Sequence, residues 1–282
     1  TPKADKYAAT LDGKAERVAT GDAVVDRLLA GSLTLGGKVG ALAGDYTFSG
    51  LKVAGQHATF TADGPLGQNA SNLKLALALP DLKRADPRLS GRADVDAEIT
   101  GPLKQLDAKA RIALANATAL ARPIPRLAID AVVKDLQGAL DSHITLSGEV
   151  DAKPAAGTIA LNRQPDDGWN LSQLALAIGS VRVDGAVTLD PSSRAAGRLT
   201  LAARNLDDLS ALALTKLGGQ LDADITLTAA EGRQNIDLTA RGSRLAGPSV
   251  SIDKLDATIG AKDIYGHPML DAAIAIDRAV AA

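Results

Sequence analysis

The sequence predicts an all-β protein: an elongated, curled antiparallel sheet built from repeats, with one open hydrophobic side and one or two short helices. Three observations predict this fold. Aliphatic and polar residues alternate with a period of two through most of the 282 residues, as in strands with one apolar side. Short glycine-containing segments separate the alternating runs. A long stretch of the pattern also occurs twice, which extends a sheet by repetition.

A short helix is the first element expected. Asp22 is placed to cap a helical segment through Val25, Leu28 and Leu29, and Gly31 ends it. The letters Asp-Ala-Val-Val at 22–25 recur at 130–133, inside an expected strand. A strand therefore remains the alternative for this segment.

Strands are expected from about Gly31 onward. In residues 93–99, four aliphatic side chains fall on one side of the strand and three acids on the other. The same alternation marks residues 108–114, 127–133, 144–146, 174–178, 181–183, 199–203, 221–227, 236–240, 250–252, 255–259 and 274–276. Such short connections join antiparallel neighbours, because a parallel crossover needs a dozen residues or more. The strands should therefore form a meander.

Tight hairpin turns are predicted at Asp-Gly and Gly-Gly pairs between these runs, since glycine readily takes the positive φ that such turns require. The predicted turns are Asp12-Gly13, Gly36-Gly37, Asp63-Gly64, Asp167-Gly168, Asp184-Gly185 and Gly218-Gly219.

One further helical segment is expected, and such segments are expected to cover the sheet between its repeats. Asn205 is placed to cap a helix through Leu206, Leu209 and Ala213. At the matching place earlier in the chain, residues 81–87 end in a proline, which limits any helix there to about one turn.

The internal repeat defines the expected organisation of the chain. Residues 89–100 recur as 217–228, within a longer match of 72–136 to 198–264 and a weaker one of 51–64 to 174–185. We expect one continuous repeat domain over 1–282, with approximate modules 1–71, 72–196 and 197–282. We also expect it to be an internal piece of a longer protein, with any anchor or signal outside it.

Composition restricts the functions that the chain can have. Hydrophobic residues make up 46% of the chain and aromatic residues 2%, so small and branched aliphatic side chains supply nearly all the apolar surface. A net charge of −2, with both signs interspersed, argues against nucleic acid as a partner. Without cysteine there is neither a disulfide nor thiolate chemistry. No apolar run approaches the roughly 18 residues that span a bilayer.

Residues with catalytic or metal-binding chemistry do not form a recognisable site. His57, His143 and His267 are widely separated and match no metal-binding spacing. Asp94, Asp96 and Glu98, like Asp222 and Asp224, share a strand side; a solvated outer surface explains them better than a calcium site. Trp169, beside a predicted turn, either anchors at a lipid interface or packs over the end of the sheet. We expect neither an enzyme, a cofactor nor a metal.

Two short sequence motifs and the length of the repeat indicate a family. Leu-Ser-Gly-Arg-Ala-Asp-Val at 89–95 and Gly-Trp-Asn-Leu-Ser-Gln-Leu-Ala-Leu at 168–176, with a module of roughly 120 residues, resemble the TamB family of the wider AsmA-like group. The resemblance extends from about residue 20 to the end. Its motifs are compositional rather than catalytic.

The resemblance implies a taco-shaped β-sheet whose hydrophobic groove conducts phospholipid acyl chains between the inner and outer membranes. It implies a periplasmic location in a Gram-negative bacterium, with the full-length protein anchored in the inner membrane. It also implies a role in outer-membrane protein assembly with an Omp85-type barrel (TamA-like), contacted through parts outside this fragment.

The groove hypothesis assigns the lining to one set of aliphatic residues: Val95, Ala97, Ile99, Ile112, Leu114, Ile129, Leu146, Leu176, Leu201, Ile225, Leu238 and Ile259. In the alternative, these residues fill a closed sandwich or solenoid core, and the chain is a passive structural repeat such as an adhesin or passenger stalk. A β-helical polysaccharide-acting enzyme would need carboxylates and aromatics along a cleft, and the chain has six aromatic residues in all.

Overall fold

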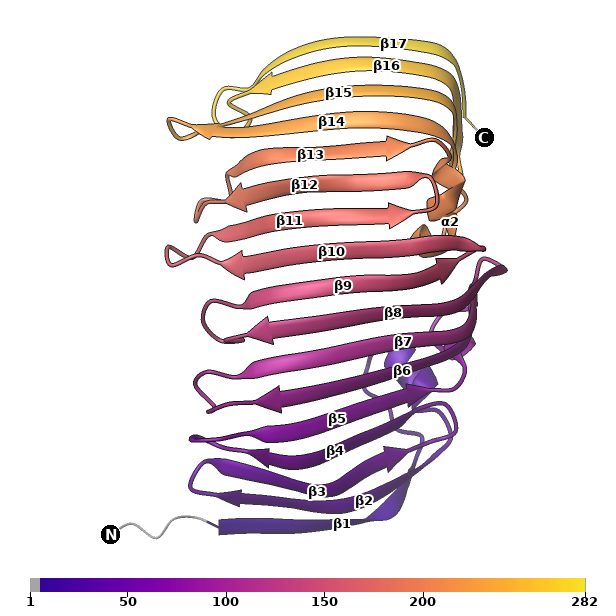
Figure 1. Ribbon diagram of the computed structural model, residues 1–282. Coiled ribbons are helices and arrows are strands. Elements are labelled where there is room, and N and C mark those ends of the chain that lie inside the picture. Colours follow the sequence, from indigo (N-terminus) through magenta and orange to yellow (C-terminus); the bar gives the residue numbers. More distant parts are fainter. Residues whose placement is uncertain (1–5, 282) are drawn as a thin grey trace. The chain divides into compact units, whose positions relative to one another are not determined.

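The computed structural model describes residues 6–281 and consists of antiparallel strands with short helical segments (Figure 1). The described residues divide into two compact units, residues 6–140 and 141–281. The boundary falls in the loop between β8 and β9, inside the expected module 72–196. The predicted fold class, an open antiparallel all-β sheet, is confirmed.

In unit 1, each strand pairs antiparallel with the strand that follows it in sequence, from β1 through β8. Its strands are β1 (Lys6–Glu16), β2 (Ser32–Leu42), β3 (Asp45–Ala54), β4 (Thr59–Leu66), β5 (Asn72–Leu79), β6 (Leu89–Thr100), β7 (Asp107–Ala119) and β8 (Arg122–Lys134). Helix α1 (Ala23–Leu28) lies between β1 and β2, and the 3₁₀ turn η1 (Leu82–Arg84) lies between β5 and β6.

Unit 2 repeats this plan from β9 to β17, again with every described neighbour antiparallel. Its strands are β9 (Asp141–Val150), β10 (Lys153–Arg163), β11 (Trp169–Ile178), β12 (Val181–Leu189), β13 (Ala195–Ala203), β14 (Gly218–Ala230), β15 (Arg233–Ala246), β16 (Val250–Lys262) and β17 (Met269–Ala281). The 3₁₀ turn η2 (Leu206–Leu209) runs directly into helix α2 (Ser210–Ala213) between β13 and β14. The meander predicted from the short connections is confirmed in both units.

The helix caps follow the sequence prediction. The Asp22 carboxylate accepts hydrogen bonds from the backbone N–H groups of Val24 and Val25, at 2.8 and 2.9 Å, at the start of α1. Asn205 Oδ1 accepts from the Asp207 N–H at 3.2 Å at the start of η2. These side chains satisfy donors that the first helical turn leaves without a partner.

Five of the six predicted hairpin turns are wrong, because their glycines lie within strands. Only Asp167-Gly168 lies in a connection, between β10 and β11. The others fall inside β1, β2, β4, β12 and β14. Strand β1 (Lys6–Glu16) also differs from the prediction, which begins the strands at about Gly31.

Three of the glycines that were wrongly assigned to turns have a different structural role. Gly37, Gly64 and Gly219 have φ angles of 118°, 119° and 93° inside their strands, and the pairing register shifts next to Gly37 and Gly219. Gly37 and Gly219 lie opposite β-bulges, where the partner strand, β3 or β15, contains one extra residue. The hairpins use other residue pairs with positive φ: Ala43-Gly44, Leu120-Ala121, Asp151-Ala152 and Glu231-Gly232.

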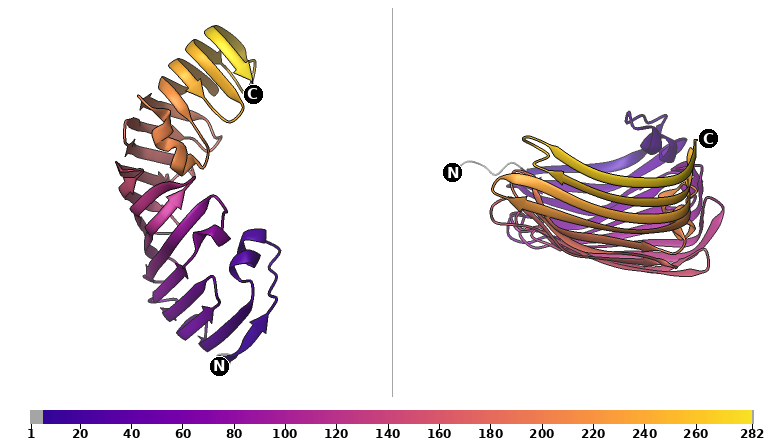
Figure 2. Two further views of the ribbon diagram at one scale, coloured as in Figure 1. Left: turned by 90° about the vertical axis from the view of Figure 1, so that its right-hand side faces the viewer. Right: turned by 90° about the horizontal axis from the view of Figure 1, so that it is seen from above.

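The internal repeat reproduces one such bulge in each unit. Gly91 in β6 and Gly219 in β14 occupy the same position of the repeated segment and have φ angles of 92° and 93°. Facing them, Asn116 in β7 and Arg244 in β15 also have positive φ. Bulges bend strands and increase their twist, and the strands of each unit are visibly bowed along their length (Figure 2). The repeat therefore carries the bend as well as the alternation.

Few large side chains are fully buried in either unit. Strands pack mainly against their neighbours in the sheet, and a second layer of strands does not cover them in the described part of the chain. The largest fully buried side chains include Ile178, Val150 and Val181, which lie at strand ends, and the turn between Ile178 and Val181 contacts η2. The compact part of unit 2 therefore lies where the helical segment covers the sheet.

Candidate functional site

Each unit presents one aliphatic side and one polar side of its sheet. We call the side that carries Val95, Ile112 and Ile129 in unit 1, and Leu176, Leu201 and Ile225 in unit 2, the aliphatic face. The opposite side, which carries the acids and threonines, is the polar face. The two faces follow directly from the pairing register, because successive side chains of a strand point to opposite sides.

In unit 1, aliphatic residues lie opposite one another across four consecutive strands, β5 to β8. The register aligns them in rows: Leu77, Val95, Ile112, Ile129; Leu75, Ala97, Ala110, Ala131; Leu73, Ile99, Ala108, Val133; and Leu79, Ala93, Leu114, Leu127. The six predicted lining residues of this unit therefore belong to one continuous surface.

In unit 2, the rows run across all nine strands. One row contains Leu146, Gly157, Leu176, Val183, Leu201, Ala223, Ala240, Ala257 and Ile274, and the next contains Ile144, Ile159, Leu174, Gly185, Leu199, Ile225, Leu238, Ile259 and Ala272. The other six predicted lining residues lie in these two rows.

None of the twelve predicted residues is buried. Eleven are half-buried, and Ile112 is 38% exposed. A sealed core would bury such side chains almost completely. The aliphatic face is therefore partly shielded by its own neighbours and otherwise accessible to solvent or to a ligand.

Ion pairs cover the polar face. Arg111 in β7 pairs with Asp130 in β8 at 2.9 Å, and Arg198 in β13 pairs with Asp224 in β14 at 2.6 Å. Asp94 pairs with Arg92 of its own strand at 2.7 Å. Exposed pairs of this kind add little stability, but they keep this face hydrated. The shallow hollows found on the surface also lie along the polar face, for example around Thr61 and Asp96.

The three histidines do not come together. His57 lies between β3 and β4, His143 in β9, and His267 in the loop before β17. Within residues 6–281, no group of three acidic or histidine side chains is arranged to hold a metal ion. The same range contains no helix with the length and apolar character needed to cross a bilayer.

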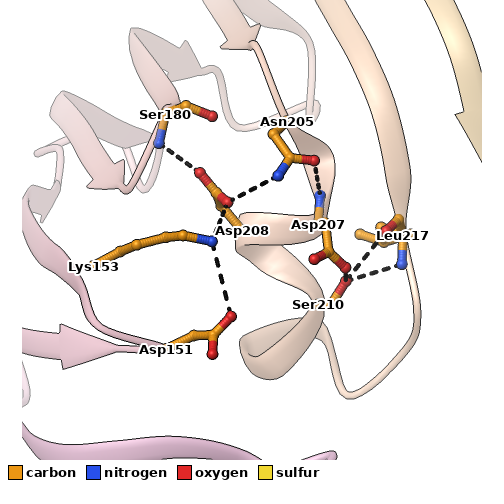
Figure 3. Close-up of polar contacts among 8 residues, drawn as sticks. All are labelled: Asp151, Lys153, Ser180, Asn205, Asp207, Asp208, Ser210 and Leu217. Atoms are coloured by element: carbon orange, nitrogen blue, oxygen red, sulfur yellow. Dashed lines mark hydrogen bonds and ion pairs between the residues drawn. The ribbon is translucent and has the colours of Figure 1, made fainter.

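A polar network that the sequence analysis missed holds the helical segment of unit 2 on the sheet (Figure 3). The Asp208 side chain, 3% exposed, accepts from Lys153 Nζ at 2.7 Å, from the Ser180 backbone N–H at 2.7 Å and from Asn205 Nδ2 at 3.3 Å. Lys153 Nζ also lies 3.8 Å from Asp151. The network joins β10, the β11–β12 turn and η2.

Electrostatics favour the charged form of both members of the central pair. Burial raises the pKa of the Asp208 carboxyl, but hydrogen bonds from Lys153 and Ser180 outweigh burial and place the pKa below its ordinary value. The hydrogen bond to Asp208 raises the pKa of Lys153 above its ordinary value, against the effect of burial. Both groups are therefore charged at neutral pH.

At the end of β10 away from Lys153, Arg163 contacts Trp169 of β11, a contact that the sequence did not reveal. The Arg163 guanidinium carbon lies 5.4 Å from the centroid of the Trp169 ring, within the range of a cation–π contact. The alternating pattern contains a signal for this pair of cations, because it places Lys153 and Arg163 on the aliphatic side of β10.

Comparison with known proteins gives no match. No family model fits the chain, and no significant similarity to a curated protein or a solved structure was found.

Proposed function

We propose that the aliphatic face of this protein binds phospholipid acyl chains and lets them move along the sheet. The observation that carries the proposal is that aliphatic rows continue across neighbouring strands in both units while their side chains remain half-buried. Each methylene removed from water onto such a surface gains about 0.8 kcal/mol. A dozen methylenes of a lipid tail would therefore gain roughly 10 kcal/mol before ordering costs.

The chemistry of these aliphatic rows suits the acyl chain of a lipid, which has no hydrogen-bonding groups. The lining is made of Ala, Val, Leu and Ile, which offer contact area but no hydrogen bonds. Such a surface holds a hydrocarbon chain in many equivalent positions. Movement of the lipid along the rows then requires no bond to a particular residue, and the protein acts without catalysis.

The cellular role that we propose follows the resemblance to the TamB family. The chain is a module of a periplasmic bridge that moves phospholipids between the inner and outer membranes and supports outer-membrane protein assembly. The whole protein is anchored in the inner membrane of a Gram-negative bacterium and works with an Omp85-type barrel through parts beyond this module. A passive stalk with a sealed core is the competing function, and the partial exposure of the lining argues against it.

The test places one charge on the aliphatic face of each unit. We expect Leu114→Lys and Ile225→Lys to reduce the phospholipid retained by the purified chain by about tenfold or more, because an unpaired ammonium on an apolar surface costs several kcal/mol. Mass spectrometry of extracted lipids measures the retained amount. Matched controls are Ala113→Lys and Thr226→Lys, the adjacent residues on the polar face.

Photo-crosslinking gives an independent readout in cells. A crosslinker at position 114 should capture phospholipid, whereas one at Asp96, on the polar face, should not. Equal capture from both positions, or full lipid retention by folded Leu114→Lys and Ile225→Lys variants, would reject the proposed function in favour of a stalk.

A further inference from the structure

Two cations interrupt the aliphatic face along β10, one at each end of the strand. Lys153 and Arg163 have the same parity as Ala155, Ile159 and Leu161, so all five side chains point to the aliphatic side. Lys153 is matched by Asp208 beneath the helical segment. Arg163 forms no ion pair with any carboxylate in the part of the chain that the structure describes.

Arg163 is held by an aromatic ring instead of an acid. It lies directly opposite Trp169 in the pairing of β10 with β11, and Trp169 in turn lies opposite Leu189 of β12. The guanidinium stacks on the indole at 5.4 Å, and both side chains are half-buried. Asp166, in the adjacent turn, accepts from the Gly168 N–H at 3.1 Å. The arginine donors are therefore left for an external acceptor.

The surroundings of this cation match the region of a phospholipid where the phosphate headgroup joins the acyl chains. A guanidinium donates two parallel hydrogen bonds to a phosphate, and stacking on an aromatic ring holds it in place. Tryptophan occurs at membrane interfaces, where one end of the ring is apolar and the other wet. Next to the pair, the aliphatic rows begin with Leu161, Leu171 and Val187.

The length of the apolar strip fits one acyl chain. Six residues of extended strand, about 20 Å, separate Arg163 from Gly157, which lies between Leu146 and Leu176. One leaflet of a bilayer contributes about half of its roughly 30 Å hydrocarbon core. Beyond Gly157 the strip ends at Ile178 and Val181, which are buried near the helical segment.

We propose that Arg163, stacked on Trp169, binds the phosphate of a glycerophospholipid whose acyl chain lies along β10 and β11 toward Leu176. This inference rests on the proposed function and adds a headgroup site to it. Phosphate recognition at this end would orient the lipid on the face, headgroup at Arg163 and tail toward the helical segment.

Trp169 is the only tryptophan in the chain, so its fluorescence reports on this site alone. The first measurement uses phosphatidylethanolamine with bromine atoms either near the carboxyl end or near the methyl end of the acyl chain. We expect stronger quenching by bromines near the carboxyl end, because Trp169 lies beside the phosphate. Equal quenching, or stronger quenching by bromines near the methyl end, would overturn the inference.

The second measurement compares phosphatidylethanolamine with diacylglycerol that has the same acyl chains and no phosphate. We expect Arg163→Gln to lower the preference for the phospholipid by about tenfold, since hydrogen bonds to charged groups contribute about 1.5–3 kcal/mol. Arg163→Lys should retain part of the preference. Arg182→Gln, an exposed arginine on the polar face of β12, is the matched control and should change nothing.

The outcomes separate this inference from the proposed function. If Arg163→Gln leaves the preference unchanged while both lipids still bind, the headgroup site is wrong and the acyl-chain function stands. If wild-type protein binds neither lipid, both proposals are wrong. If inorganic phosphate alone perturbs Trp169 as strongly as phosphatidylethanolamine does, the site binds free phosphate and the lipid assignment is wrong.

Discussion

At the scale of single residues, Asp208 decides whether the helical segment of unit 2 stays on the sheet. Its carboxylate is 3% exposed and accepts from three donors that belong to three different segments. Gly179 belongs to the same arrangement, because a Cβ at this position would lie 2.4 Å from Asp208 Oδ2. A buried carboxylate of this kind is stable only with its full set of partners.

We expect Asp208→Asn to lower the free energy of unfolding by about 2 kcal/mol. Removing one member of a buried pair costs about 3–5 kcal/mol, and the partial exposure of Lys153, at 35%, reduces the cost. Chemical denaturation monitored by circular dichroism measures it. Asp222→Asn, which changes an exposed carboxylate on the polar face of β14, serves as the comparison.

The pH dependence provides a second check of the same prediction. Because the pKa of Asp208 is lower in the folded state than its ordinary value of 3.8, its stabilisation is fully present above that value and is lost as pH falls through the folded pKa. The stability difference between wild type and Asp208→Asn should therefore shrink in acid. A difference that stays constant down to the acid limit of folding would show that the charge of Asp208 is not what holds the segment.

At the scale of elements, glycines opposite β-bulges occupy the same position in the two copies of the repeat. A Cβ at Gly219 would lie 2.3 Å from the Arg244 carbonyl oxygen, and one at Gly91 would lie 2.4 Å from Ala117 Cα. Both contacts are with backbone, which cannot move aside without breaking the pairing. These two glycines are therefore required by both the positive φ and the close approach of the next strand.

We expect Gly219→Ala to destabilise unit 2 by about 1–3 kcal/mol, because the residue must keep a strained φ against a neighbouring strand. The adjacent glycine provides the control. A Cβ at Gly218 meets only Ala246 Cβ at 3.4 Å, without a positive φ, so Gly218→Ala should be nearly neutral. Thermal unfolding of the two variants compares them, and equal losses would contradict the role of the bulge.

At the scale of the whole molecule, protection from solvent is uneven within each unit. The described side chains of β17 are all exposed, and those of β1 nearly all, while β11 ends and β12 begins at the buried residues Ile178 and Val181. Within their units, β1 pairs with β2 and β17 pairs with β16. Repeat sheets of this kind lose structure locally, since each strand is stabilised mainly by its neighbours.

We expect amide hydrogen exchange to be slower in β11 and β12 than in β1 and β17, by about tenfold or more. Mass spectrometry of peptic fragments resolves these strands. Asp208→Asn should accelerate exchange near Ile178 and leave β1 unchanged. Uniform exchange rates along the chain would instead indicate one cooperative unit with a sealed core.

Much of the fold was predictable because its rules are local. The period of two decides which side chains of a strand share a face, so the twelve predicted residues could be assigned to the aliphatic face from alternation. Short connections impose antiparallel pairing, and the caps at Asp22 and Asn205 involve donors only two or three residues away. Whether a glycine lies in a turn or inside a strand depends on how its segment pairs with a neighbouring strand. The turn predictions therefore failed at Gly37, Gly64 and Gly219.

The sequence by itself determined the alternation, the meander and the membership of the aliphatic face, because these depend on neighbours along the chain. Only the tertiary structure decided that Lys153 meets Asp208, 55 residues away, that Arg163 stacks on Trp169, and that the face stays half-exposed. Each depends on which strands lie side by side and on what covers them. Alternation assigns a side chain to a face, but packing across the sheet determines whether that face is covered.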